Sequence, residues 1–191
     1  MRRVADAFAA AGYDLHLVGG PVRDALMGRG VHDLDFTTAA RPDVIETILG
    51  RLTPATWDIG RAFGTIGASL NDDVVEVTTY RADSYDPSSR KPTVEFGDDL
   101  TADLVRRDFT VNAMALSVVN GAFADPHGGL EDLADQVLRT PSPPEVSFGD
   151  DPLRMMRAAR FTSQLGFTPV PEVVAAMTAM AERIDIISAE R

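Results

Sequence analysis

The sequence predicts an α/β fold: a mixed α/β unit followed by a helical unit. Two observations support this prediction. Over roughly residues 1–140, short stretches with the alternating pattern of strands interchange with stretches of helical periodicity. From Asp151 onward the pattern is helical, with one break near residues 166–171. We therefore expect two units, residues 1–140 and residues 141–191.

In the first part of the chain, helical and strand patterns alternate closely. Residues 2–11 have an amphipathic helical pattern, and the aspartates Asp6 and Asp14 in and after it argue against a signal peptide. Two further helices are expected, over residues 21–28, with Pro21 in the first turn, and over residues 41–52. The expected strands are residues 15–20, 32–38, 64–70 and 74–81.

Loops and helices dominate the rest of the chain. The polar residues 83–99, which include Pro87 and Pro92, are expected to form a mobile loop. After it we expect, in order, a partly helical segment 101–116, a hairpin 118–126, a short helix 128–136, a proline-rich connector 139–148 and helices from residue 151 to about residue 183. Ser188 resembles a helix N-cap, so the chain is expected to be a truncated piece that stops where another helix begins.

The composition excludes several classes of protein. The chain has no cysteine, which rules out a disulfide framework and thiolate metal sites and favours a reducing, cytoplasmic environment. It has no apolar run near the ~20 residues that a membrane span needs, so no membrane partner is expected. The formal net charge of -11 would repel a phosphate backbone on average, so nucleic-acid contacts must come from local clusters of arginine.

Two aspartates in the segment "HDLDFTT" indicate a metal site. Asp33 and Asp35 are two residues apart on a predicted strand, so both side chains point to one face. Two adjacent carboxylates repel each other unless a cation lies between them. A few oxygen ligands suit Mg²⁺, and two ions about 4 Å apart could activate a hydroxyl and stabilise a pyrophosphate leaving group. The alternative is a solvated strand edge.

The glycine turn before this strand indicates a phosphate site. Backbone N–H groups at Gly19 and Gly20 can approach a phosphate closely, and Arg23 follows one turn into the next helix. The segment is neither a P-loop nor a dinucleotide-binding motif. The alternatives are a plain tight turn and a surface ion pair between Arg23 and Asp24. Together with the paired aspartates, the turn favours a triphosphate–metal site.

Two arginine segments extend this hypothesis. In "RRDFTVNAMAL", Arg106 and Arg107 could supply a second clamp on a triphosphate, with Asp108 or Asn112 near the sugar; the alternative is a solvated face. In "DDPLRMMRAARF", three arginines follow an aspartate at helical spacing. Their spacing bears on which base could be bound.

Asp151 and Arg154 could form a planar pair that reads a base. A carboxylate accepts from an amino group and a guanidinium donates to a ring nitrogen or carbonyl, so the pair would accept cytosine and adenine and reject guanine and uracil. The alternative is a helix cap paired with an arginine. Arg157 would continue the row toward phosphate or ribose. Arg160 is expected roughly on the far side of the helix from Asp151, at ~100° per residue.

Five segments in a fixed order resemble the bacterial class II CCA-adding tRNA nucleotidyltransferase and poly(A) polymerase family. They are "LVGGPVRDALMG...HDLDFTT", "FGTIGASL...VVEVTTYR", "RRDFTVNAMA", "DPHGGLEDL" and "DDPLRMMRAARF". The resemblance covers about residues 15–191. It implies a nucleotidyltransferase head, with a small mixed sheet flanked by helices, followed by an all-α neck.

The resemblance also implies roles for individual residues. Asp33 and Asp35 match the metal-binding pair, which implies Mg²⁺ as the cofactor, and Glu76 is a further candidate carboxylate. The residues that match the nucleotide-binding motifs of the head are Gly20, Arg23 and Arg107. Those that match the neck motif selecting CTP or ATP are Asp151, Arg154, Arg157 and Arg160. One departure is Asp150, where the family usually has glutamate.

The implied activity is the addition of CCA to the 3′ end of tRNA from CTP and ATP, with release of pyrophosphate, here in an N-terminal fragment. Poly(A) synthesis is the main alternative because it shares these motifs, and a nucleotide-binding module without turnover is another. The segment 60–81 and the full-length loop 83–99 favour CCA addition. In the family, further helical domains hold the tRNA. The oligomeric state is left open.

Overall fold

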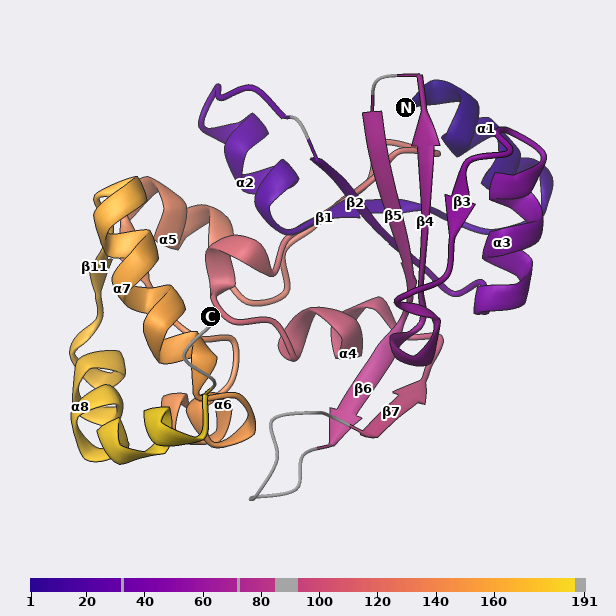
Figure 1. Cartoon of the computed structure of the whole chain (residues 1–191). Helices are drawn as coiled ribbons and strands as arrows, with labels where there is room; N and C mark the ends of the chain where they lie inside the picture. The colour runs from indigo at the N-terminus through magenta and orange to yellow at the C-terminus, as the bar shows by residue number, and fades with distance from the viewer. Residues whose placement is uncertain (32, 72, 85–92, 188–191) are drawn as a thin grey trace.

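The computed structural model of the protein describes residues 1–191 except residues 32, 72, 85–92 and 188–191 (Figure 1). Residues 85–92 of the expected mobile loop 83–99 and the predicted N-cap Ser188 therefore lie outside the described residues. None of the helices in the described part has the length and apolar character that crossing a membrane requires.

The core of the fold is a seven-stranded mixed sheet with the strand order β3-β4-β5-β2-β1-β8-β9. Its strands are β1 His16–Val18, β2 Asp33–Thr38, β3 Thr56–Trp57, β4 Thr65–Leu70, β5 Asp73–Thr79, β8 Ala115–Ser117 and β9 Phe123–Ala124. β2 and β5 pair in parallel, and the other neighbours are antiparallel. The predicted mixed sheet flanked by helices is thus confirmed.

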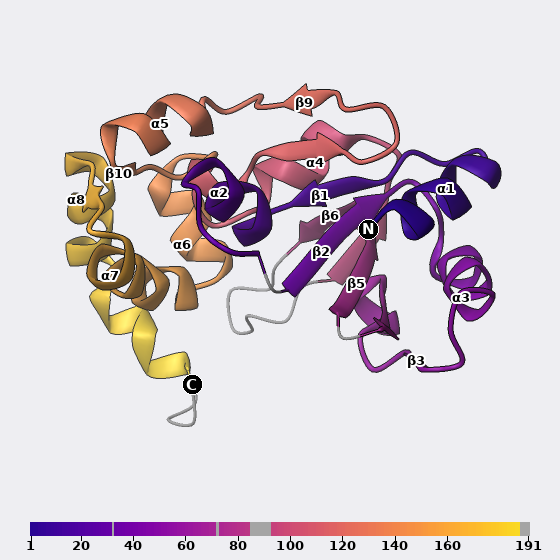
Figure 2. The same cartoon turned by 90° about the horizontal axis from the view of Figure 1, so that it is seen from above.

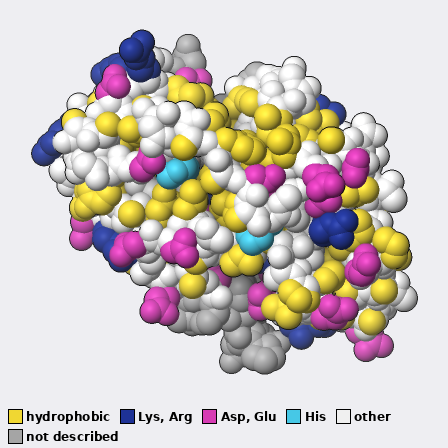
Figure 3. All heavy atoms as spheres, turned by 180° about the vertical axis from the view of Figure 1, so that it is seen from behind, with side chains coloured by type: hydrophobic (Ala, Val, Ile, Leu, Met, Phe, Trp, Pro, Cys, Tyr) yellow, Lys and Arg dark blue, Asp and Glu magenta, His cyan; other side chains and the backbone are white. Residues whose placement is uncertain are grey.

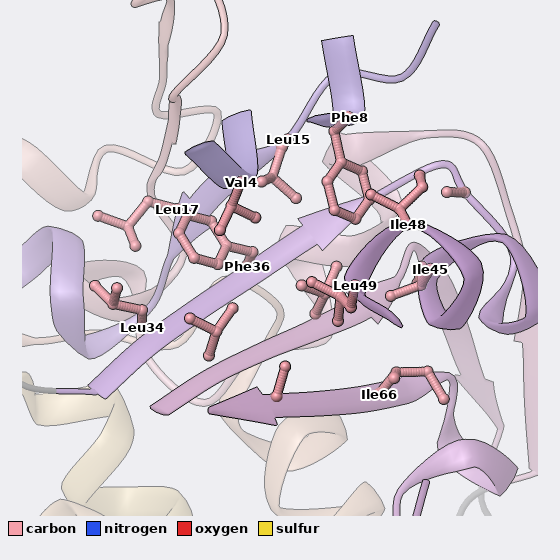
Figure 4. Close-up of a cluster of buried hydrophobic side chains, with 14 of the residues drawn as sticks. Val4, Phe8, Leu15, Leu17, Leu34, Phe36, Ile45, Ile48, Leu49 and Ile66 are labelled. Atoms are coloured by element: carbon pink, nitrogen blue, oxygen red, sulfur yellow. The ribbon is translucent and has the colours of Figure 1, made fainter. Parts of the chain in front are cut away.

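Two helices, α1 Arg2–Ala10 and α3 Pro42–Gly50, cover one face of this sheet (Figures 2 and 4). Phe8 of α1 and Leu49 of α3 are fully buried against Leu34 and Phe36 of β2. Because side chains alternate along a strand, burying these two residues turns their neighbours toward the other face. The hydrophobic core therefore fixes the orientation of the paired aspartates on β2.

The opposite face of the sheet is covered only in part. Over β1 and β8 it packs against the helix α4 Leu100–Val105. The remaining elements of residues 1–140 are α2 Gly20–Leu26, α5 Gly129–Asp135, the short 3-10 helices η1 Arg61–Phe63 and η2 Thr110–Asn112, and the antiparallel strands β6 Arg81–Ser84 and β7 Thr93–Phe96. The part of this face formed by β2, β5 and β4 is open to the site described below.

The C-terminal helices gather at one end of the molecule, beside α2 and α5 (Figures 1 and 2). They are α6 Pro144–Asp150, α7 Leu153–Leu165, α8 Pro171–Ala179 and the 3-10 helix η3 Ala181–Ile186. Phe161 and Phe167 pack with Phe109, Val111 and Leu138 in one buried cluster. This shared cluster fixes α7 against the rest of the chain.

Several sequence predictions are corrected by the structure. The expected loop 83–99 contains the strand β7, and the expected connector 139–148 contains most of α6, with Pro144 in its first turn. The break at residues 166–171 contains a strand, β11 Thr168–Pro169, which pairs in parallel with β10 Val137–Leu138. In the segment 101–116 the helix ends at Val105, which agrees with the prediction that this segment is only partly helical. The region after residue 141 is therefore not purely helical.

Acidic side chains are spread over the surface. Figure 3 shows one face on which Asp and Glu side chains lie among hydrophobic ones and basic side chains are few. This agrees with a formal net charge of -11. Most of the arginines of the site described below are instead at least partly buried.

Candidate functional site

Three carboxylates lie close together on the open face of the sheet. Asp33 and Asp35 alternate with the buried Leu34 and Phe36 on β2, and Asp35 is the direct partner of Glu76 on β5. The surrounding protein desolvates Asp35 and raises its pKa, an effect that Arg107 opposes and Asp33 reinforces. Desolvation also raises the pKa of Glu76, and the charges of Asp35 and Asp33 raise it further. The carboxylates thus repel one another, as expected where a cation belongs.

The donor set fits a divalent cation that keeps other ligands. Only oxygen donors are present at the paired aspartates, which suits a hard ion. Among the residues that the structure describes, no group of three or more acidic or histidine side chains is arranged to hold a metal by itself. An ion at Asp33 and Asp35 would therefore complete its shell with water and substrate oxygens.

The glycine turn before α2 allows a close approach to the backbone. Gly19 has a φ of 73°, in the left-handed region that favours glycine. A Cβ on Gly19 would lie 3.2 Å from Nη1 of Arg107, so a side chain there would crowd that guanidinium. Gly20 begins α2 and lines the hollow beside Asp35. The turn therefore brings backbone and a distant arginine together.

Arg23 is held inside the site rather than on the surface. It is only 8% exposed, its Nη1 donates to Oδ1 of Asn112 at 2.7 Å, and its Nε donates to Oδ1 of Asp24 at 2.9 Å. The ion pair with Asp24 exists, but the alternative of a surface pair is wrong. Arg23 lines the same hollows as Gly20 and Asp35.

A buried aspartate on α4 organises the arginine pair. Asp103 is fully buried and accepts from Arg106 at 2.8 Å and 3.0 Å and from Arg107 at 3.3 Å. Burial alone would raise the pKa of Asp103, but the two guanidinium groups outweigh it and hold the pKa below its ordinary value. Sequence reasoning missed Asp103, although its i,i+3 and i,i+4 spacing to the two arginines was a usable signal.

The two arginines differ in what they leave available. Arg106 is engaged by Asp103 and, at 3.4 Å, by Asp83. Arg107 reaches the pocket, and its Nε has no hydrogen-bond partner among the described residues. An unpaired donor inside a protein is costly unless a ligand satisfies it. Arg107 is thus placed to meet an anion.

One pocket of about 250 Å³ collects most of the residues predicted from the sequence. Its walls include Gly20, Arg23, Asp35, Arg107, Arg157 and Arg160. Asp35 also lines two adjoining hollows, one toward Asp33 and one toward Glu76. The carboxylate of Asp35 therefore stands where a cationic pocket and the open face of the sheet meet.

The α7 arginines close this pocket from the C-terminal side. Arg157 donates to Asp108 at 2.6 Å, and Asp108 also accepts from Asn112 at 3.0 Å. The guanidinium of Arg160 lies 5.0 Å from the ring centre of Phe161. Arg160 lines the pocket and Asp151 does not, so its expected position away from Asp151 stays a prediction; Asp151 itself has extended backbone outside α7. Arg157 and Arg160 are i,i+3 neighbours on one face.

The structure does not join Asp151 and Arg154 as an ion pair. Oδ1 of Asp151 accepts from the N–H of Leu153 at 3.0 Å, which is a capping contact at the start of α7. Arg154 is 6% exposed and donates to Oγ of Ser147 at 2.8 Å and to the carbonyl of Arg106 at 2.6 Å. Neither residue lines the pocket that Asp35 shares with Arg107. Base reading by this pair stays a prediction.

Comparisons with known proteins find similar proteins over the whole chain. Residues 15–139 match the model of the poly A polymerase head domain. The whole chain is 42% identical to a CCA-adding enzyme of Levilactobacillus brevis, and 95% of it is 43% identical to a CCA-adding enzyme of Bacillus subtilis. It covers 47% and 45% of these two proteins. The chain thus spans about half the length of the curated relatives it matches.

Solved structures give the same result. The chain superposes over its full length on 45% of the Bacillus stearothermophilus CCA-adding enzyme in complex with CTP, with a TM-score of 0.89 and 38% identity. It also matches a tRNA nucleotidyltransferase complexed with a primer tRNA and an incoming ATP analogue. There the TM-score is 0.76 and the identity 32%, over 94% of this chain and 50% of the other.

Proposed function

The chain belongs to the poly(A) polymerase head-domain family, which the CCA-adding enzymes share, and from this premise we propose that it adds CCA to the 3′ end of tRNA. The reaction would transfer CMP and AMP from CTP and ATP and release pyrophosphate. The observation that carries this proposal is the pocket in which Asp35, Arg23 and Arg107 meet. A carboxylate metal site beside two guanidinium groups fits a metal-bound triphosphate.

The paired aspartates would hold the metal. Asp33 and Asp35 are the ligands we propose, with Glu76 as a neighbouring carboxylate, and Mg²⁺ is the ion that oxygen ligands and phosphates favour. When bound, such an ion supplies charge neutralisation and an activated hydroxyl. Glu76, whose pKa is raised, faces the same space and can accept a hydrogen bond from a substrate hydroxyl.

The arginines would hold the triphosphate. Arg23 and Arg107 both lie beside the glycine turn and line the pocket, where their guanidinium groups can donate to phosphate oxygens. Arg157 and Arg160 close the pocket from α7. Four fixed cations around one pocket bind and orient a polyanion and stabilise the charge that develops on the leaving pyrophosphate.

Base selection is proposed for the segment around the start of α7. Asp151 and Arg154 match the family positions that choose CTP or ATP. In the structure Arg154 bonds to the carbonyl of Arg106, the neighbour of Arg107. Rotation of Arg154 away from that carbonyl would be needed to present its guanidinium to a base. We also propose the division into a head, residues 1–140, and a helical neck beginning at residue 141.

Related proteins support this assignment. One structural neighbour was solved with CTP and another with a primer tRNA and an ATP analogue. We propose the same partners here, CTP, ATP and the tRNA 3′ end, in the cytoplasm, where a chain without cysteine is at home. Poly(A) synthesis is the second candidate because the matching family model is named for it.

Incubation with tRNA that lacks its 3′ end separates these candidates. The purified chain is given CTP alone, ATP alone, or both, and the products are sized. CCA addition predicts extension by two residues with CTP alone and by one more only when ATP is added. Long products with ATP alone would show poly(A) synthesis. Nucleotide binding without any extended product would indicate a nucleotide-binding module without turnover.

A further inference from the structure

A second hollow on the sheet adjoins the carboxylate site. It has a volume of about 430 Å³ and is lined by Trp57, Ile59 and Phe63 together with Gly67, Glu76 and Arg81. Glu76 and Arg81 also line the hollow that contains Asp35. The two hollows therefore share part of their walls. We call the part formed by Trp57, Ile59, Phe63 and Gly67 the aromatic groove.

Strand register places this groove in line with the carboxylates. Trp57 on β3 pairs with Gly67 on β4, Gly67 pairs with Glu76 on β5, and Glu76 pairs with Asp35 on β2. Directly paired residues share a face of the sheet. The four residues thus form one row across four strands, and three strand spacings put Trp57 roughly 14 Å from Asp35.

The groove is built to present an aromatic surface. A Cβ on Gly67 would lie 2.1 Å from the indole of Trp57, so only glycine lets the ring lie flat against β4. Phe63 is 38% exposed and Ile59 is 90% exposed, although both are large and apolar. The guanidinium of Arg81 lies 5.9 Å from the ring centre of Phe63 and is paired with Asp83 at 3.0 Å. Large apolar side chains are therefore partly or largely exposed to solvent at this position.

The chemistry of the reaction restricts what can lie here. A nucleotidyl transfer needs a triphosphate on one side of the metal pair and an acceptor hydroxyl on the other. The arginine pocket, lined by Arg23 and Arg107, lies on one side of Asp35 and would hold the triphosphate. The aromatic groove extends from the other side, past Glu76, and is left for the acceptor. Stacking on aromatic rings tolerates any base and suits a single strand whose end changes with each addition.

We propose that the aromatic groove binds the terminal bases of the single-stranded RNA acceptor, stacked on Trp57 and Phe63, with Arg81 near the backbone. This rests on the proposed function and names where its second substrate lies. The 3′ hydroxyl of the bound strand would then point along the row toward Glu76 and Asp35. No base-specific contact is needed.

The chain carries its own probe, because Trp57 is its only tryptophan. Titration with a short single-stranded RNA ending in CC should quench Trp57 fluorescence in a saturable way, since a base stacks on the indole. CTP, bound in the arginine pocket, should leave the emission unchanged. The same RNA with a terminal dye gives an independent binding signal by anisotropy.

Phe63→Ala provides the test by mutation. It should weaken RNA binding roughly tenfold, as the loss of one stacking ring predicts, and leave the Kd for CTP unchanged. Phe123→Ala is the matched control: Phe123 is 44% exposed and lies on β9, at the opposite edge of the sheet. It should change neither value. Thermal melting of both variants checks their fold.

Distinct outcomes overturn this inference. Saturable quenching by CTP that Phe63→Ala removes would assign the groove to the incoming nucleotide. RNA binding seen by anisotropy without quenching, or equal in Phe63→Ala and the parent, would place the acceptor elsewhere. Absence of RNA binding by both signals would also overturn the inference. Failure of the parent chain to bind CTP would instead contradict the proposed function.

Discussion

At the residue scale, the site depends on how neighbouring arginines are used. Arg106 is committed to Asp103 and Asp83, whereas Arg107 lies against the backbone at Gly19 with an unpartnered Nε. Burial lowers the pKa of Arg107, although the charge of Asp103 opposes this effect. Keeping the guanidinium charged therefore costs free energy, which a bound anion would offset. The two arginines are adjacent in sequence but lie in different surroundings.

Replacing Arg107 should weaken nucleotide binding directly. We expect Arg107→Ala to raise the Kd for CTP between about tenfold and a hundredfold, as the loss of a charge-assisted hydrogen bond predicts. Isothermal titration with CTP measures it. Arg51→Ala, which removes an exposed arginine after α3, is the control and should leave the Kd unchanged. Equal Kd values for both variants would remove Arg107 from the triphosphate site.

The base-selection hypothesis also belongs to single residues. Asp151→Ala should let UTP or GTP compete with CTP and ATP, because the correct base loses a hydrogen-bond partner worth on the order of a few kcal/mol. Arg154→Ala should do the same and also lower the melting temperature, since Arg154 is buried against Ser147 and the Arg106 carbonyl. Competition assays with the four nucleoside triphosphates measure the base preference of each variant. Unchanged preference in both variants would leave a cap and a structural arginine.

At the scale of elements, α4 links the sheet to the arginine pair. Asp103 accepts from both arginines and, at 3.3 Å, from the hydroxyl of Thr37 on β2. A single fully buried carboxylate thus fixes the end of α4 over the open face of the sheet. Removing one partner of such a buried set leaves the other charges uncompensated.

Asp103→Asn should therefore destabilise the fold by about 3 kcal/mol or more. The pKa of Asp103 is lowered in the folded state, so its contribution is complete above the unfolded value of about 3.9 and is lost as pH falls through the folded value. Urea unfolding at pH 7 and near pH 3 should show the variant's deficit shrinking in acid. Asp98→Asn, at an exposed ion pair, is the control. A constant deficit would contradict this account.

Sequence patterns predicted some elements well and others poorly. The strands around residues 32–38 and 74–81 and the helix at residues 41–52 were found because each buries a regular apolar face. β3, with two residues, is too short to show a period, and Pro144 in α6 was interpreted as a loop signal although proline is tolerated in a first turn. Pairing of β10 with β11 joins residues 31 positions apart in the sequence and leaves no local pattern.

The candidate site shows the same limit. Gly20, Arg23 and the paired aspartates lie within one short segment, so their relation could be predicted from spacing. The contact of Arg107 with Gly19 and the ion pair of Arg157 with Asp108 join distant segments and depend on the packed helices. The resemblance to a family supplied these residues, but not their partners.

At the scale of the whole molecule, charge opposes the RNA substrate. The formal net charge is -11, and the arginines of the site line one pocket rather than forming an extended basic surface. Affinity for RNA comes largely from neutralised phosphates, so a chain of this charge holds little of the tRNA backbone. The relatives are about twice as long, and we expect their additional length to provide those contacts.

We therefore predict that the chain binds CTP and ATP but binds tRNA weakly. Titrations with tRNA at low and at high salt, beside a CTP titration, measure this. The tRNA affinity should be low at both salt concentrations and show a shallow salt slope, because few phosphates are neutralised. Tight and steeply salt-dependent binding by these 191 residues would mean that the arginine clusters outweigh the acidic surface.

Asp35 and its neighbours are proposed to form the site at which a nucleotide is transferred to RNA. The most direct measurement is incorporation of labelled CMP into tRNA lacking its 3′ end, with pyrophosphate release counted in parallel, by the parent, Asp35→Asn and Asp73→Asn. Asp73 starts β5 and lies outside the hollows that Asp35 lines. We predict one pyrophosphate per CMP for the parent and Asp73→Asn, and only background for a correctly folded Asp35→Asn. Turnover by Asp35→Asn within a few-fold of the parent would contradict the account.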